Sequence, residues 1–225
     1  MATLLIFGAS RGLGRALAEE HLKRGWTVIA TVRQTGVLVE LQQQWGDALR
    51  VETLDIVDWP AVDDLRRRLE GAVVDLLFVN AGISGTMVPI GDVDPDRFCE
   101  MMLVNALAPL RIVDRYAALV PASGTIAVMS SELGSIGQNT SGGFDDYRMS
   151  KTALNMGLRS IAGRRAVEGR TYLAVHPGWV RTDMGGPNAL LAIEDSVPRI
   201  ADVLERRRGS GGMSFVNYQD LDVPW

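Results

Sequence analysis

Two hydrophobic patterns alternate along the chain. Short, almost continuous apolar runs predict buried parallel strands, because strands covered by helices on both faces are apolar on both sides. These runs span residues 3–7, 26–32, 49–54, 73–79, 124–129, 171–175 and 213–216. Strands that alternate with helical segments indicate an α/β fold with a doubly wound parallel sheet. A length of 225 residues suits a single domain, 1–225.

The segments between the runs carry apolar residues every three or four positions, which predicts helices that cover the sheet. We expect these helices at residues 13–24, 37–45, 59–69, 95–119 and 147–165. Asp58 and Asp94 each precede a proline within two residues, the pattern of a helix N-terminus. Asn105 and Pro109 interrupt the fourth helix, whose methionines are expected in the core.

A glycine-rich turn joins the first strand to the first helix. It reads Gly8-Ala9-Ser10-Arg11-Gly12-Leu13-Gly14, a GxxxGxG spacing. Glycines allow a close approach of the backbone to a pyrophosphate, and the helix start offers free N–H groups and a positive dipole end. The alternative is a plain tight turn. The flanking strand and helix favour a nucleotide phosphate site.

The end of the second strand bears on the choice of nucleotide. Sites that select NAD carry an acidic residue about 20 residues after the glycines, where it binds the ribose 2′-hydroxyl. This chain has Thr31-Val32-Arg33 at that place, and Arg11 adds a second cation in the glycine turn. An arginine can pair with a 2′-phosphate, so we expect NADP, with NADPH preferred over NADH. A simple surface arginine is the alternative.

Tyr147 and Lys151 are candidates for acid/base chemistry. Their spacing of four residues places both side chains on one face of the last predicted long helix. A neighbouring ammonium group is expected to lower the pKa of the phenol and make it a general acid/base for a carbonyl or alcohol. Taken alone, the pair also fits a solvent-exposed helix face.

Composition narrows the remaining classes. The net charge of −4 argues against nucleic acid as a partner. The lone Cys99 has no disulfide or CxxC partner and is expected to be a buried apolar residue. His21 and His176 lack metal-site spacing, so we expect no metal. Without a signal sequence or a long apolar span, the protein is expected to be cytoplasmic, with no membrane partner.

Several motifs together resemble those of the short-chain dehydrogenases/reductases. The glycine turn is followed by Asn80-Ala81-Gly82, Ser130-Ser131, Tyr147–Lys151 and His176-Pro177-Gly178, in the order and spacing of that family. The resemblance runs from residue 3 to about 183. It implies a Rossmann-type fold with a cofactor half at about 1–120 and a catalytic half at about 121–225.

Within this family the chain resembles the small carbonyl-reductase branch that includes the C-factor and sniffer-like proteins. The residues that carry this resemblance are 133–140, 177–186, Phe215 and Pro224-Trp225. It implies an NADPH-dependent reduction of an aldehyde, ketone or quinone. A cofactor-binding signalling or regulatory protein with little turnover is the alternative that the same branch leaves open.

The resemblance also implies residue roles. Tyr147 would protonate the carbonyl oxygen, Lys151 would assist it and hold the nicotinamide ribose, Ser131 would bind the substrate oxygen, with Ser130 as the fallback, and Asn105 would anchor a proton-relay water. The implied cofactor contacts are Gly8, Ser10, Arg11, Gly12, Leu13, Gly14, Arg33, Asp55, Ile56, Asn80, Ala81, Gly82, Tyr147, Lys151, Pro177, Gly178, Val180 and Thr182. The chain departs from the family at Phe7, where a threonine is usual.

The segment 183–199 is expected to cover the substrate. It contains no arginine or lysine before Pro198, which favours a small, neutral, hydrophobic carbonyl or alcohol. The family commonly pairs the helices at about 95–119 and 147–165 between subunits, which implies a homodimer or homotetramer. The apolar residues on these helices are explained equally well by core packing.

Overall fold

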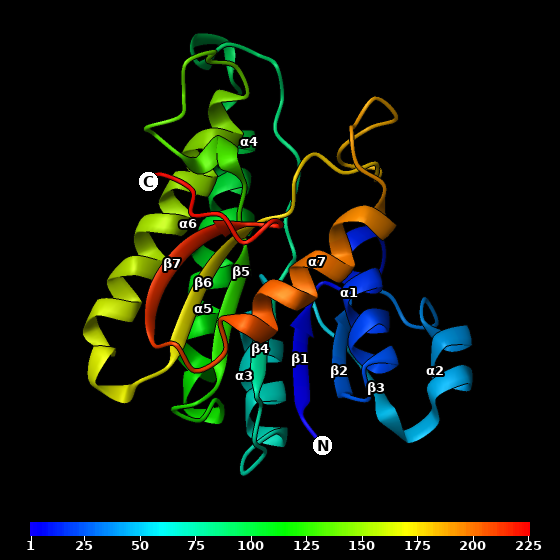
Figure 1. Cartoon of the computed structure of the whole chain (residues 1–225). Coiled ribbons are helices and arrows are strands. Elements are labelled where there is room, and N and C mark those ends of the chain that lie inside the picture. The colour runs from blue at the N-terminus through cyan, green and yellow to red at the C-terminus, as the bar shows by residue number, and fades with distance from the viewer.

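The computed structural model describes residues 1–225 and shows one parallel sheet with helices on both faces (Figure 1). The seven strands lie in the order β3-β2-β1-β4-β5-β6-β7. They are β1 (Thr3–Phe7), β2 (Thr27–Val32), β3 (Leu49–Thr53), β4 (Leu76–Val79), β5 (Thr125–Met129), β6 (Thr171–His176) and β7 (Gly212–Asn217). The chain starts in the middle of the sheet, builds outward to β3, and then crosses to β4 on the other side of β1. The predicted Rossmann-type fold is confirmed.

The helices form two layers. They are α1 (Gly12–Lys23), α2 (Val39–Trp45), α3 (Trp59–Arg68), α4 (Pro95–Met102), α5 (Ala108–Tyr116), α6 (Asp145–Arg164) and α7 (Ile193–Arg206). Buried side chains of α3, α5 and α6 form one cluster with the sheet, and those of α1, α2 and α7 form another on the opposite face. No helix is both long enough and apolar enough to cross a membrane.

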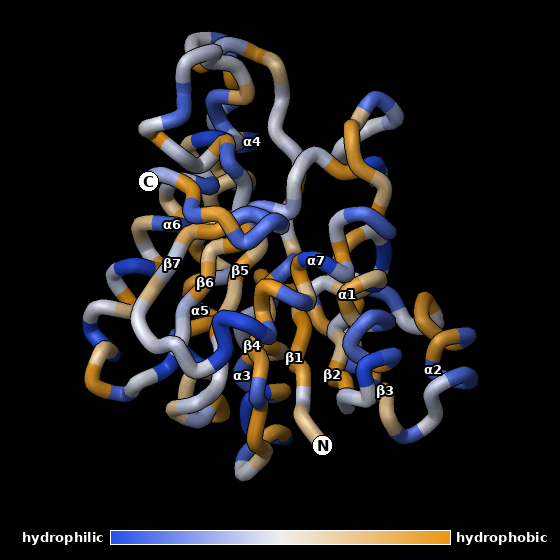
Figure 2. Tube along the Cα trace, in the orientation of Figure 1, coloured by the Kyte–Doolittle hydropathy of each residue, from blue (hydrophilic) through white to orange (hydrophobic).

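Alternation along β1 explains why both faces are filled. Leu5 and Phe7 belong to the cluster under α3, α5 and α6, whereas Leu4 and Ile6 belong to the cluster under α1 and α7. Successive side chains of a strand point to opposite faces, so a central strand must be apolar at every position. Figure 2 shows the central strands as largely hydrophobic segments.

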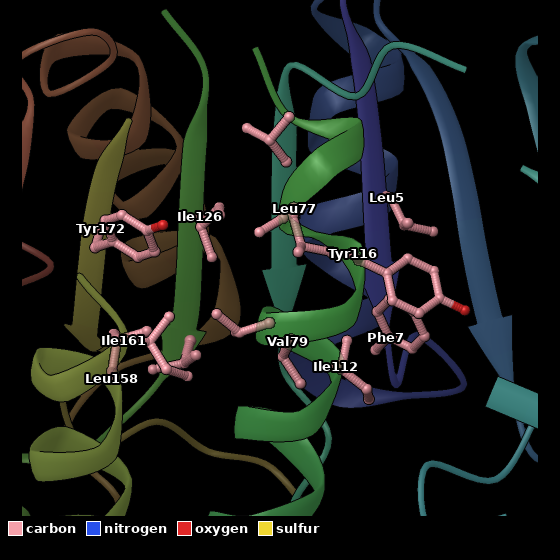
Figure 3. Close-up of a cluster of buried hydrophobic side chains, with 14 of the residues drawn as sticks. Leu5, Phe7, Leu77, Val79, Ile112, Tyr116, Ile126, Leu158, Ile161 and Tyr172 are labelled. Carbon is pink, nitrogen blue, oxygen red and sulfur yellow. The ribbon is translucent and has the colours of Figure 1, made fainter. Parts of the chain in front are cut away.

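Phe7 packs into the first of these clusters (Figure 3). Its ring lies edge-on to Tyr116, with 5.1 Å between centroids, and the Tyr116 hydroxyl donates a 2.7 Å hydrogen bond to the carbonyl of Val62. The turn that follows is stabilised from the neighbouring strand, because the Gly8 N–H donates to the Thr31 hydroxyl at 3.1 Å. Position 7 holds phenylalanine where the family usually has threonine, but the turn still has this hydrogen bond between Gly8 and Thr31.

The structure differs from the sequence prediction in several places. The expected strand at 73–79 begins only at Leu76, because the Val74 N–H donates to the Leu119 carbonyl outside the sheet. The expected helix at 95–119 is divided by a π-helical turn at Leu103–Leu107. The prediction for Cys99 is wrong, because its side chain is exposed on α4, where Met101 is the buried residue.

Candidate active site

The predicted motifs meet at one edge of the sheet. The glycine turn follows β1, Asn80-Ala81-Gly82 follows β4, Ser130-Ser131 follows β5, and Pro177-Gly178 follows β6. These four strands are neighbours and run parallel, so their carboxyl ends lie side by side. The connection changes direction between β1 and β4, and such switch points are where open α/β sheets bind their ligands.

The glycine turn is held by the segment after β4. The Asn80 side chain donates a 2.8 Å hydrogen bond to the carbonyl of Gly8. A Cβ atom at Gly8 would lie 2.7 Å from Ala81, and one at Gly14 would overlap the Gly8 carbonyl oxygen. Gly8, Gly14, Asn80 and Ala81 thus shape the turn through contacts with each other.

The start of α1 is free to receive an anion. No side chain caps this helix and its first turn has no acidic residue, whereas Asp58 caps α3 and Asp94 caps α4. The unpaired N–H groups and the dipole of a helix start attract a phosphate. Gly12 has φ of 54°, and a Cβ there would come within 3.6 Å of Thr182, across the gap between the two loops. Ser10 and Leu13 belong to the same turn. This geometry fits a dinucleotide pyrophosphate.

The two candidate cations for a 2′-phosphate are both exposed. Arg33 lies just beyond β2, and Arg11 forms an ion pair with Asp183 from the loop after β6. Asp55 is exposed beyond β3, where its carboxylate accepts the N–H of Val57 at 3.1 Å. The side chain of Ile56, the next residue, is buried in the core cluster.

Tyr147, Lys151 and Ser131 lie close together. Tyr147 and Lys151 occupy the first two turns of α6, with the Lys151 ammonium 5.5 Å from the centroid of the phenol ring. The Ser131 hydroxyl lies close enough to the phenol of Tyr147 to lower its pKa. The Ser130 hydroxyl instead donates to the Asn155 side chain at 2.7 Å, where it is buried. Ser131 is therefore the serine placed beside the phenol.

Burial changes both pKa values in this group. It raises the pKa of Tyr147 to about 12, although the nearby Ser131 hydroxyl opposes the shift. It lowers the pKa of Lys151 to about 8, because a buried ammonium loses hydration. We expected Lys151 to lower the Tyr147 pKa; in the chain without a bound nucleotide this expectation is wrong, because the pKa is raised. The Lys151 ammonium is turned to the main chain, donating to the Met129 carbonyl at 2.9 Å.

Asn105 lies in the π-helical turn and is fully buried. Its amide exchanges hydrogen bonds with the backbone of Ile83, at 2.8 and 2.9 Å. A Cβ atom at Gly82 would lie 3.1 Å from the Asn105 oxygen and 3.7 Å from the Lys151 ammonium, so both groups flank Gly82. The structure therefore brings Asn105 near Lys151, as the family resemblance implies.

The loop after β6 closes the site on the other side. Pro177 and Val180 are buried, and Gly178 packs so closely on Leu191 that a Cβ atom would overlap it. The Thr182 hydroxyl accepts the N–H of Gly185 at 3.0 Å. This hydrogen bond holds the Thr182 side chain in place beside Gly12.

Sequence reasoning missed some residues of the site. His176 ends β6 with its Nε2 atom 3.4 Å from Glu132, which lowers the pKa of the Glu132 carboxyl. Asp146 is fully buried directly before Tyr147. Glu132 lies 44 residues before His176 in the sequence, and Thr86, which donates its N–H to Asp146, lies 60 residues before it. No local pattern indicates such contacts.

Comparison with known proteins decides the family. A family model described as short chain dehydrogenase matches residues 2–189, which is most of the chain. The chain belongs to the short-chain dehydrogenase family. Among curated members of the family, C-signal of Myxococcus xanthus is 41% identical over 157 residues, covering 68% of this chain and 93% of that protein.

Solved structures of the family are similar over the whole chain. A short-chain dehydrogenase/reductase from Burkholderia multivorans with bound NADP has 47% identity and a TM-score of 0.97, covering 100% of this chain and 99% of that one. The carbonyl reductase Sniffer of D. melanogaster has 29% identity and a TM-score of 0.91, with full coverage of both chains. The chain is thus an oxidoreductase of this family, similar to both C-signal and sniffer-like members.

Proposed function

We propose that the protein is an NADPH-dependent reductase that converts an aldehyde, ketone or quinone to an alcohol. The arrangement of Ser131, Tyr147 and Lys151 carries this proposal, because it gathers a hydroxyl, a phenol and an ammonium at the same edge of the sheet as a helix start that is free to bind a pyrophosphate. A general acid has no use in a protein that only binds a nucleotide.

Each side chain has a chemical task. When bound, NADPH supplies the hydride that adds to the carbonyl carbon. The Ser131 hydroxyl donates a hydrogen bond to the substrate oxygen, and the Tyr147 phenol gives its proton to that oxygen. With a pKa of about 12, Tyr147 is protonated at neutral pH and ready to act as the acid. The Lys151 ammonium stabilises the phenolate that remains until a proton returns from solvent, along the side of the site where Asn105 lies.

The proposed cofactor contacts follow the loops. The N–H groups at Gly12, Leu13 and Gly14 would hold the pyrophosphate, and Arg33 would pair with the 2′-phosphate. Arg11 would join Arg33 when its exposed pair with Asp183 opens, which costs little because exposed ion pairs contribute about 0–1 kcal/mol. NADP in the structure of the Burkholderia multivorans relative supports this choice of nucleotide. The remaining predicted contacts would line the adenosine and nicotinamide parts of the same groove.

The proposed substrate is neutral and hydrophobic. Exposed apolar side chains come from the loops after β4, β5 and β6: Met87, Val88, Ile90, Ile136, Phe144, Trp179, Met184 and Leu190. Arg181, the nearest cation in the sequence, donates to the carbonyls of Ala189 and Leu190. Its guanidinium is therefore engaged with the loop itself, and an apolar carbonyl compound fits this lining better than an anion.

Assembly and location are part of the same proposal. We place the subunit contact on the outer faces of α5 and α6. Met149 and Met156 are exposed on α6, and both helices line a groove of about 530 Å³. A homodimer or homotetramer would cover these faces, and sedimentation of the purified protein tests it. The exposed thiol of Cys99 is compatible with the reducing cytoplasm, the location we propose.

Titration of the purified protein with NADPH and NADH, followed by nucleotide fluorescence, tests the proposal at its first step. We expect NADPH to bind at least about tenfold more tightly, in keeping with a charge-assisted hydrogen bond to the 2′-phosphate. Equal affinities would contradict the role of Arg33. Failure of both nucleotides to bind would overturn the proposed reductase function.

The similarity to C-signal favours one second candidate, a signalling protein with little turnover. Binding of NADPH without reduction of any carbonyl in a broad screen would support this candidate, especially if Tyr147→Phe left the biological effect unchanged.

A further inference from the structure

The segment between β4 and α4 is held by side chains of other elements. It contains only a short 3-10 turn at Ile90–Asp92 and no strand, so regular backbone pairing does not fix it. Beyond Gly82, its external hydrogen bonds join Ile83 to Asn105, Ser84 to Arg97, Thr86 to Asp146 and Ile90 to Asp145. Two of these partners are the first two residues of α6, directly before Tyr147, where this segment passes the start of the helix (Figure 1).

Asp146 is fully buried, as is Asn105. One carboxylate oxygen, Oδ1, accepts the Tyr147 N–H at 2.7 Å and the Thr86 N–H at 3.3 Å. The other oxygen, Oδ2, is buried without a partner in a side chain that is 0% exposed. A half-satisfied buried carboxylate costs stability, although the start of α6 offsets part of this cost through its dipole. Stability alone therefore does not explain the aspartate.

Gly85 brings the same segment against the catalytic tyrosine. A Cβ atom at Gly85 would overlap the Cβ of Tyr147 and would lie 2.8 Å from Oδ1 of Asp146. The backbone of the segment thus rests directly on Tyr147, next to the hydrogen bond between Thr86 and Asp146. A shift of this segment must move the phenol or open a gap beside it.

We propose that Asp146 is a positioning residue for the reaction. Its carboxylate fastens the β4–α4 segment to the first turn of α6, and so fixes Tyr147 relative to the substrate and to Ser131. The proposal rests on the proposed reductase function. Misplacement of a reacting group by about 1 Å can slow a reaction by about a hundredfold, so a contact of this kind acts on kcat more than on cofactor binding.

The chain offers matched variants. Asp146→Asn keeps an oxygen that can accept both N–H groups and puts an amide nitrogen in the place of the unpartnered oxygen. Asp146→Ala removes the contact. Asp145→Ala is the control. Asp145 also accepts an N–H from the segment, at 3.1 Å from Ile90, but it is only partly buried, and the Tyr147 N–H donates to Asp146 instead. Gly85→Ala keeps the Asp146 carboxylate in the chain but presses a methyl group against Tyr147 and Asp146, so it disturbs the same contact from the side of the segment.

The test measures kcat and KM for a carbonyl substrate, the Kd for NADPH, and hydrogen exchange of the Thr86 amide. We expect Asp146→Ala and Gly85→Ala to lower kcat by about 10- to 100-fold while the Kd for NADPH changes by less than about twofold. Asp146→Asn should recover most of kcat, and Asp145→Ala should resemble the unmodified protein. Exchange at Thr86 should speed up in Asp146→Ala and stay slow in Asp146→Asn.

Several outcomes would overturn the proposal. One is a fall in melting temperature for Asp146→Ala with kcat unchanged, and another is an equal loss of kcat in Asp145→Ala. A loss in Asp146→Asn as large as in Asp146→Ala would assign the effect to charge instead of position. If Asp146→Ala does not fold, unchanged kcat in Gly85→Ala overturns the proposal.

Hydrogen exchange at the Thr86 amide tests the positioning role of Asp146 independently of the proposed reductase function. A protein that binds no NADPH and reduces no carbonyl would end the proposed function, yet exchange at Thr86 would still report on the fastening. Unchanged exchange in Asp146→Ala would then show that the carboxylate does not hold the segment.

Discussion

Lys151 and Tyr147 respond to burial in opposite chemical senses. The lysine becomes easier to deprotonate, with a pKa of about 8, and the tyrosine becomes harder to deprotonate, with a pKa of about 12. Both changes favour the neutral form, as burial in a medium of low dielectric requires. In the chain without a bound nucleotide, Tyr147 therefore keeps its proton at neutral pH, and Lys151 is mostly charged below about pH 8.

The pKa of Lys151 predicts how stability varies with pH. A lysine with a folded pKa of about 8 and an ordinary value of 10.5 binds fewer protons in the folded state between these values. The free energy of unfolding should then rise with pH in this window. From pH 7.5 to 9.5 we expect a gain of about 2 kcal/mol relative to Lys151→Met, measured by urea unfolding. A flat or falling difference would contradict the burial of a lysine that can lose its charge.

Arg33 is the residue that we expect to set cofactor choice. It is exposed at the end of β2, free to approach a 2′-phosphate. Arg33→Ala should raise the Kd for NADPH by about 10- to 100-fold, because a charge-assisted hydrogen bond contributes about 1.5–3 kcal/mol, and should leave the Kd for NADH almost unchanged. An equal effect on both nucleotides would mean that Arg33 acts through the fold. Arg50→Ala is a suitable control on the neighbouring strand, where Arg50 pairs with Glu52.

Helices α1 and α6 each contain a glycine, and the two glycines differ in how closely other atoms pack against them. Gly14 in α1 touches the Gly8 carbonyl and the Asn80 side chain, whereas a Cβ at Gly163 in α6 would meet nothing within 4 Å. The two positions form an internal comparison, because both substitutions to alanine favour a helix by about 0.5–1 kcal/mol.

Gly14→Ala should therefore lower the melting temperature and weaken NADPH binding, since the methyl group forces the glycine turn apart. Gly163→Ala should raise the melting temperature by a few degrees and leave binding unchanged. Calorimetry with and without NADPH measures both effects. A Gly14→Ala protein that binds NADPH normally would contradict the close contact between Gly14 and Gly8.

At the element scale, the sequence predicts the strands and the glycine turn well, because their signals are local. Strand β1 and the Asp58 and Asp94 caps are found as expected. The π-helical turn that carries Asn105 is not predicted, and its Asn105 side chain pairs with Ile83, 22 residues away, a contact that no local pattern indicates. The exposure of Cys99 is missed because composition alone does not tell which face of α4 is covered.

On the scale of the whole molecule, the family and the edge of the sheet that holds the site follow from the order of the motifs. The contacts between loops do not. Arg11 pairs with Asp183 at a sequence separation of 172 residues, and Asp146 meets Thr86 at a separation of 60. Such pairs depend on how the loops at the strand ends fold over the site, for which a single sequence carries no periodic signal. The roles of the site residues stay predictions until variants are measured.

The central claim is that Tyr147 is the acid of an NADPH-dependent carbonyl reductase. The most direct measurement is NADPH oxidation with a panel of hydrophobic aldehydes, ketones and quinones, comparing the unmodified protein with Tyr147→Phe at equal NADPH saturation. We expect turnover by the unmodified protein, a loss of at least about 100-fold in kcat for Tyr147→Phe, and nearly unchanged NADPH affinity. Equal turnover by both proteins would contradict the claim, as would tight NADPH binding with no turnover of any carbonyl by the unmodified protein.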